Sequence, residues 1–486
     1  MSHMVLNKEE ISKAVFWKYG ERLSSQVINV VVQIVLARCL EPSLFGELAI
    51  LLVFVNIATL FVQSGISTYI IQKEDLSKED ISTVLFVSLS MAVLMYAVLF
   101  FLSPSVEKYY GYYSLSKTLR VISISLIPSS FCAVYQGLLS RKMAFKTIFI
   151  RSMISIPFSG VVGVVLAKNG WGLWALVIQH LVNQLLTAIV LVIGFRQRIR
   201  FVPNWDRIKR IISFGGNVLI QSLLIQFIES IRTLLIGKVY SSEELAYYDK
   251  GTTYTSYIYS GVSLTLSGVL LPTLTKVQSN PEIMKKIAKR FLSISMFIVT
   301  PLLVGFSVTS TTWVPLLLTE KWIPSIPFII IFALSKITGP MTTVNLQIYY
   351  SLGKVQLSRR IVSIECAFSL ATLLLTYRIS TTAIAWGYVI ISVLDIFLFS
   401  IPNQKTINYS WKEQLFDFLP NGIGAIVMAV IVLFIGRLVI NRILLLIIQV
   451  FVGIVVYLAF AVLIRNPSYI YVKGYLISLT KRKAKE

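Results

Sequence analysis

Apolar stretches of about 20 residues, separated by short charged segments, follow one another along the whole chain. A helix needs about 20 apolar residues to cross the roughly 30 Å hydrocarbon core of a bilayer. We therefore predict an all-α integral membrane protein with about fourteen transmembrane helices. The predicted helices span residues 23–40, 45–71, 81–103, 119–139, 148–167, 173–195, 211–237, 254–271, 291–308, 324–350, 361–377, 383–401, 419–439 and 443–464.

Composition and charge agree with a membrane protein and indicate its orientation. Only 14% of the residues are charged, whereas a soluble domain carries about 25%. The net charge of +23 would suggest nucleic acid in a soluble chain, but here it indicates loops that face anionic lipid. Most of the 45 Lys and Arg lie at the two termini and after even-numbered predicted helices. Because such residues favour the cytoplasmic side, both termini are predicted to be cytoplasmic.

A weak internal repeat indicates two pseudo-symmetric six-helix lobes. An offset of 200 residues places Leu36-Ala37-Arg38 on Ile236-Gly237-Lys238 and Gln26 on Gln226. Six helices are an even number, so the halves would enter the membrane in the same direction, as parallel repeats do. The predicted divisions are a cytoplasmic N-terminal segment (1–22, of which 1–4 resemble a vector-derived leader), an N-lobe (23–195), a basic linker (196–210), a C-lobe (211–401), two further helices (402–464) and a basic cytoplasmic tail (465–486).

This organisation favours a transporter over an enzyme. Two-lobed helical membrane proteins typically work by alternating access, with the substrate site between the lobes. The longest loops are too short for an extramembrane catalytic domain, and neither a catalytic triad nor a paired-carboxylate arrangement is visible. We expect no cofactor or metal, since zinc-like Cys/His spacing and a GxxxxGK[ST] loop are both absent from the sequence. Energy would then come from an ion or substrate gradient.

Charged residues inside the predicted helices are the first site candidates, because a charge in hydrocarbon is costly. Lys336 lies near the middle of its helix and Arg232 lies three residues after Glu229. Either cation could bind an anionic substrate or pair with a structural partner. Arg38, at the end of the first helix, is a further candidate, although it could equally extend to the interface.

Acidic and amide side chains complete the candidate set. Glu229, Glu365 and Asp395 could bind a coupling Na⁺ or H⁺, or could pair with nearby arginines. The amides predicted to line a substrate path are Gln26, Asn29, Gln33 and Gln221. The first three are spaced three and four residues apart and share one helical face. Such a face could instead form a hydrogen-bonded seam between helices.

The chain resembles polysaccharide-unit flippases of the Wzx type, in the colanic-acid and teichuronic-acid exporter branch of the multidrug/oligosaccharidyl-lipid/polysaccharide export superfamily. The resemblance covers most of the first twelve predicted helices. It is carried by Trp17, Leu36-Ala37-Arg38, Glu41-Pro42, Phe45-Gly46, Gly65, Ile70-Ile71-Gln72-Lys73, Leu235-Ile236-Gly237-Lys238, Tyr247-Tyr248 and Leu271-Pro272-Thr273-Leu274.

The resemblance implies a flippase of the bacterial cytoplasmic membrane. Its substrate would be an undecaprenyl-diphosphate-linked oligosaccharide, moved to the outer leaflet for surface polysaccharide assembly, with polymerase machinery as a further partner. Arg232 and Lys336 would meet the diphosphate, and the amides would meet sugar hydroxyls. One departure is that Arg232 stands where the family more often has an acidic residue. A cation-coupled drug or metabolite exporter of the same superfamily is the alternative, and a membrane glycan polymerase or ligase is a third reading.

Overall fold

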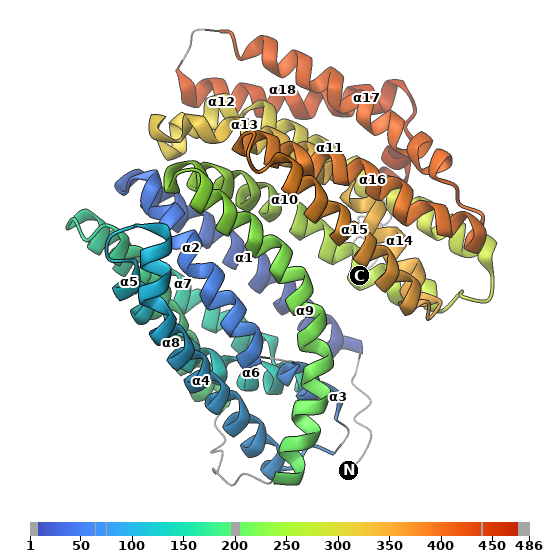
Figure 1. Cartoon of the computed structure of the whole chain (residues 1–486). Helices are drawn as coiled ribbons and strands as arrows, with labels where there is room; N and C mark the ends of the chain where they lie inside the picture. Colours follow the sequence, from blue (N-terminus) through green and yellow to red (C-terminus); the bar gives the residue numbers. More distant parts are fainter. Residues whose placement is uncertain (1–7, 64, 74, 196–204, 439–440, 475–486) are drawn as a thin grey trace. The chain divides into compact units, whose positions relative to one another are not determined.

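The computed structural model describes residues 8–63, 65–73, 75–195, 205–438 and 441–474 (Figure 1). The described part is helical and contains no strand, which confirms the all-α prediction. It forms two compact units, residues 1–246 and 247–486, so the division falls inside α10.

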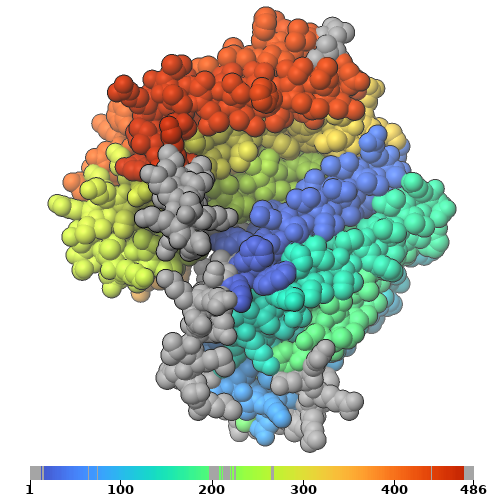
Figure 2. Space-filling view, turned by 180° about the vertical axis from the view of Figure 1, so that it is seen from behind, coloured from blue at the N-terminus to red at the C-terminus, as the bar shows by residue number. Residues whose placement is uncertain are grey.

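Unit 1 contains nine helices in its described part and the beginning of a tenth. They are α1 (Lys8–Cys39), α2 (Pro42–Gln63), α3 (Ile66–Gln72), α4 (Lys78–Tyr110), α5 (Leu115–Ser123), α6 (Leu126–Arg141), α7 (Phe145–Lys168), α8 (Leu173–Phe195), α9 (Trp205–Val239) and the beginning of α10 (Ser242–Thr275). Figure 2 shows α1 beside α7 on one face of this unit. The helix α9 packs against α2, α3 and α4 and therefore belongs to unit 1. The predicted linker lies mostly outside the described residues, and the predicted lobes stay a prediction.

Unit 2 contains the rest of α10 and the helices that follow it. They are α11 (Pro281–Val308), α12 (Ser310–Trp313), η1 (Val314–Leu318), η2 (Glu320–Ser325), α13 (Ile326–Ile337), α14 (Gly339–Ser351), α15 (Val355–Thr376), α16 (Thr381–Ile407), α17 (Trp411–Ile435) and α18 (Arg442–Leu463). Residues 467–474 are also helical.

The fourteen predicted segments all fall on helices, but fourteen membrane spans are not confirmed. Eleven helical stretches in the described part are long and apolar enough to cross a bilayer. The helices α1, α9 and α15 are not among them. In α1 and α15, polar side chains such as Gln26, Asn29 and Glu365 lower the mean hydropathy.

Three predicted segments are interrupted. Segment 119–139 breaks at residues 124 and 125, between α5 and α6. Segment 45–71 ends its first helix at Gln63, and Gly65 adopts φ +66° before α3 begins. This left-handed conformation costs glycine little because it has no Cβ. Segment 324–350 breaks at Thr338, between α13 and α14. Pro340 follows, and its missing N–H cannot continue the helical hydrogen bonds.

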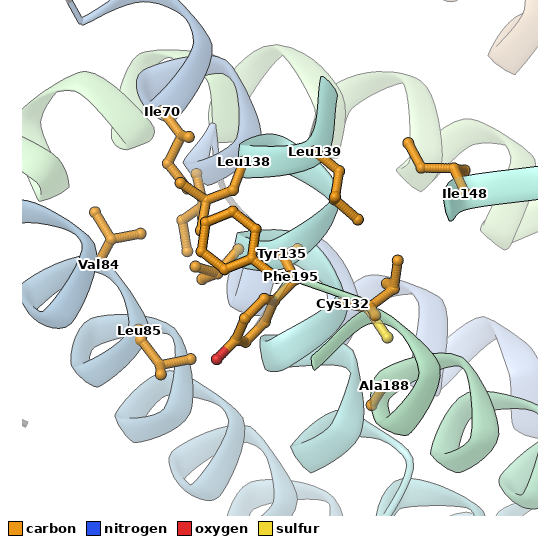
Figure 3. Close-up of a cluster of buried hydrophobic side chains, with 14 of the residues drawn as sticks. Ile70, Val84, Leu85, Cys132, Tyr135, Leu138, Leu139, Ile148, Ala188 and Phe195 are labelled. Carbon is orange, nitrogen blue, oxygen red and sulfur yellow. The ribbon is translucent and has the colours of Figure 1, made fainter. Parts of the chain in front are cut away.

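A hydrophobic core joins α3, α4, α6 and α8 within unit 1 (Figure 3). Tyr135 and Phe195 meet edge to face, with ring centroids 5.5 Å apart. Leu138 and Leu191 are buried beside them, and the free thiol Cys132 fills a position in the same core.

Buried amides hold unit 2 together near the beginning of α17. Asn345 on α14 donates to Gln414 Oε1 on α17 at 2.9 Å, and Asn403 on α16 donates to Asn345 Oδ1 at 2.6 Å. The hydroxyl of Ser400 donates to the same Gln414 oxygen at 3.1 Å. These hydrogen bonds join three helices through their buried amides, although within the described residues the Oδ1 atom of Asn403 has no hydrogen-bond partner.

An ion-pair network fixes the beginning of α9 to the beginning of α4. Asp80 Oδ1 lies 2.6 Å from Lys73 Nζ and 2.8 Å from Arg207 Nη1. Arg207 also pairs with Glu79 at 2.7 Å. The Asp80 side chain is 1% exposed, whereas that of Glu79 is 61% exposed. Asp80 also completes a capping box with Ser77.

We predict that Asp80→Ala lowers the free energy of unfolding by about 3 kcal/mol, because it leaves two cations without their buried partner. The matched control, Glu79→Ala, removes an exposed partner of the same arginine and should cost less than about 1 kcal/mol. Thermal unfolding of both purified variants in detergent measures the difference. Equal losses would show that burial of Asp80 does not decide the strength of the network.

Candidate functional site

Polar residues predicted on the first helix lie along α1 in unit 1. Gln26, Asn29 and Gln33 are half-buried, although helices in hydrocarbon rarely leave amides partly open unless water or protein faces them. Arg38 is exposed in the last turn of α1. The side chain of Gln221 lies outside the described residues.

The two predicted charges on α9 form a pair with unequal exposure. Arg232 Nη1 lies 3.8 Å from Glu229 Oε1, as their three-residue spacing allows. The arginine side chain is 4% exposed, whereas the glutamate side chain is 57% exposed. Unit 1 therefore contains a buried arginine whose acidic partner, three residues earlier on the same helix, is exposed.

The remaining predicted charges gather around α16 in unit 2. Lys336 lies in the last turn of α13, two residues before the break, and Thr338 Oγ1 at the break donates to the carbonyl of Ser392 at 3.4 Å. Asp395 lies one turn further along α16. Glu365 on α15 lies within electrostatic range of Asp395. Residues from α13, α15 and α16 thus come together beside a broken helix, the position at which transporters often bind ions or substrates.

Asp395 differs from the other acids in its surroundings. It is buried, and within the described part of the chain its Oδ1 atom has no hydrogen-bond partner. A buried carboxylate oxygen without a donor is costly unless a proton or a cation satisfies it. Asp395 and Glu365 therefore form an acidic pair suited to a single positive charge.

The structure adds a polar face on α10 that the sequence analysis missed. Asp249, Thr253, Ser256, Tyr257 and Ser260 are half-exposed and share one side of the helix. The predicted helix started at residue 254, which left the first two in a loop. The run of polar residues after Ser242 hid the true beginning of the helix, although Glu243 and Glu244 in its first turn are a typical helix-start signal.

Behind this face, Lys250 is buried between aromatic rings. Its Nζ lies 5.8 Å from the ring centroid of Tyr254 and 5.5 Å from that of Trp322. Tyr254 is itself buried against Trp313. Tyr259 hydrogen-bonds with Thr343 at 2.9 Å. Tyr257 on the same helix belongs to the half-exposed polar face.

Each unit therefore carries polar side chains on its long helices, and those of α10, α13 and α16 lie in candidate membrane spans. Such side chains suit a hydrated polar ligand, with cations for an anionic group and amides or hydroxyls for a sugar. Among the described residues, no group of three or more His, Cys, Asp or Glu could hold a metal ion.

Comparison with solved structures shows the fold. The structure of the lipid II flippase MurJ in its inward closed conformation matches 94% of this chain and 98% of its own, with a TM-score of 0.78 at 13% identity. An inward-facing multidrug resistance transporter of the MATE family matches 80% of this chain and 98% of its own, with a TM-score of 0.61 at 14% identity. The chain thus has the fold of these transporters.

Sequence comparison identifies the family. The succinoglycan biosynthesis transport protein ExoT of Rhizobium meliloti is 24% identical over 93% of this chain and 92% of its own length. The teichuronic acid biosynthesis protein TuaB of Bacillus subtilis is 21% identical over 70% of this chain and 71% of its own. The model of a family described as polysaccharide biosynthesis protein matches residues 35–327, more than half of the chain. The chain therefore belongs to the polysaccharide biosynthesis protein family.

Proposed function

We propose that the protein is a flippase for undecaprenyl-diphosphate-linked oligosaccharide repeat units. It moves them from the cytoplasmic to the outer leaflet of the bacterial cytoplasmic membrane by alternating access, for surface polysaccharide assembly. The observation that carries this proposal is the presence of cations, amides and hydroxyls on the long helices of a MurJ-like fold, with Lys336 and the hydroxyls of α10 inside candidate membrane spans. The family match and the biosynthetic relatives support a glycan substrate.

The chemistry of such a substrate fits the candidate residues. A diphosphate needs cations and N–H donors in a low-dielectric path, and Lys336 and Arg232 supply them. Arg38 offers a further cation near the end of α1. Sugar hydroxyls exchange hydrogen bonds with amides, which Gln26, Asn29, Gln33 and Gln221 provide.

Orientation and partners follow from the same proposal. The Lys and Arg distribution supports cytoplasmic positions for both termini. A polymerase on the outer face would consume the translocated units, since a flippase relocates its substrate without joining it. The named relatives and structural neighbours are transport, flippase and biosynthesis proteins.

The first test is translocation in liposomes. With a labelled undecaprenyl-diphosphate oligosaccharide, the wild-type chain should speed leaflet exchange, and Lys336→Ala or Arg232→Ala should slow it at least about tenfold. The reason is that a charge-assisted hydrogen bond to the diphosphate contributes roughly 1.5–3 kcal/mol. The matched control, Lys117→Ala, removes an exposed lysine on α5 and should leave the rate unchanged.

The outcomes of the liposome test distinguish the proposed function from the proposed binding residues. If the wild type exchanges substrate and all three variants keep its rate, the flippase stands and the cation assignment is wrong. No exchange by the wild type with the host's own glycan, with or without an ion gradient, would contradict the flippase.

A second test asks whether the polar face of α10 meets water. In a background with Cys39, Cys132 and Cys366 replaced by serine, Ser256→Cys and Ser260→Cys should react with a charged methanethiosulfonate. The control Ile390→Cys, an exposed apolar position on α16, should react at least about tenfold more slowly, because thiolates form poorly in lipid. Similar rates at the three positions would place the α10 face outside the water-filled path.

Coupling to a cation is the second part of the proposal, and the unsatisfied Asp395 oxygen supports it. The acidic pair of Glu365 and Asp395 would hold H⁺ or Na⁺, and Glu229 is the corresponding acid on α9. The same arrangement would serve a cation-coupled drug exporter, which is the alternative function.

We predict that Asp395→Asn and Glu365→Gln abolish the acceleration that a proton or sodium gradient gives to translocation. The reason is that a neutral amide neither takes up and releases a proton near neutral pH nor carries the negative charge that attracts Na⁺. The exposed control Glu320→Gln should keep the full acceleration. Rates measured with and without each gradient provide the test. Gradient dependence that survives in both variants would exclude this pair from coupling, and unchanged drug sensitivity of cells carrying them would count against the exporter.

A further inference from the structure

Four basic residues occupy the first turns of α11, and α17 neutralises one side of them. Lys285 Nζ lies 2.8 Å from Glu413 Oε2, and Lys289 Nζ lies 2.9 Å from Asp417 Oδ1. Residues four apart share a helical face. This face of α11 is therefore committed to the contact between two helices of unit 2.

The other two cations, Lys286 and Arg290, occupy a neighbouring face. Both are exposed, and in the described part of the chain neither makes an ion pair. Ile283 is exposed three residues before Lys286, so an apolar side chain shares their face. The continuous apolar part of α11 begins at Phe291, which places both cations at the level of the headgroups.

The helical residues 467–474 are fixed beside this face. Asn466 Nδ2 donates to Asn421 Oδ1 at 2.8 Å, with both asparagines buried, and Ser468 N–H donates to Asn466 Oδ1 at 2.9 Å. Tyr469 packs against Phe297 of α11, with ring centroids 6.5 Å apart. The segment is thus held to α11 and α17 by defined contacts.

This docking brings an exposed aromatic residue to the unpaired cations. The Arg290 guanidinium lies 4.7 Å from the ring centroid of Tyr471, which is exposed. Ile283, Lys286, Arg290 and Tyr471 together form what we call the basic patch. A mixture of cations, a tyrosine and an exposed aliphatic side chain is typical of a surface at the membrane interface.

We propose that the basic patch binds the headgroup of an anionic phospholipid, with Lys286 and Arg290 on the phosphate and with Ile283 and Tyr471 against the upper acyl chain. The apolar members of the patch favour a lipid over a soluble phosphate, because a free anion leaves them in water. Lys473, in the same helical segment as Tyr471, adds a positive charge near the patch. Glu282, one turn before Lys286 on α11, adds a negative charge that reduces the positive charge of the patch. This site is independent of the translocated substrate and of the flippase proposal.

The experiment titrates the full chain, purified in neutral detergent, with phosphatidylglycerol and follows bound lipid by native mass spectrometry. Lys286→Gln with Arg290→Gln should weaken binding by about fivefold for each cation removed. The matched control, Lys276→Gln, changes an exposed lysine in the loop between α10 and α11 and should leave the affinity unchanged. Glu282→Gln removes the opposing charge and should strengthen binding.

The remaining arms decide the kind of ligand. Ile283→Ser with Tyr471→Ser should weaken phosphatidylglycerol and leave glycerol phosphate unaffected. The proposal is overturned if the double charge variant keeps the wild-type affinity, if phosphatidylcholine binds as tightly, or if glycerol phosphate matches the lipid. The Glu282→Gln arm keeps every basic residue, so an unchanged affinity in that variant also counts against the patch, even if the charge variants fold poorly.

Discussion

Polar groups inside hydrocarbon must find partners, and the rest of the structure depends on this constraint. Buried amides of α14, α16 and α17 satisfy one another. Asp80 collects two cations at one end of α4. Polar side chains of α1 and α10 are instead half-exposed, and Glu229 on α9 is exposed. Packing within each unit thus determines which polar groups are buried in contacts between helices and which stay open to the surface.

Much of the fold could be predicted from the sequence because a membrane-spanning helix is a local pattern. Each of the fourteen apolar segments falls on a helix, and the all-α class follows from them. Helix ends were harder, since α10 starts twelve residues before its apolar part. The interruption at Gly65 depends on one backbone angle, which hydropathy does not register.

Candidate site residues could be predicted from the sequence only where a charged residue lies inside a predicted membrane helix. The pairing of Glu229 with Arg232 follows from their spacing. The proximity of Glu365 and Asp395 joins two helices, and that of Asp80 and Arg207 joins residues 127 apart in sequence. Such pairs depend on helix packing, for which one sequence carries no signal. The polar face of α10 was missed because its first members were assigned to a loop.

The amide network also shows what α17 contributes to the packing of unit 2. Gln414 on α17 satisfies Asn345, which in turn accepts from Asn403. Without α17, the amide of Asn345 would lose its partner Gln414, and a buried polar group left without a partner costs about 1–3 kcal/mol. The beginning of α17 therefore completes a buried hydrogen-bond network that α14 and α16 cannot complete by themselves.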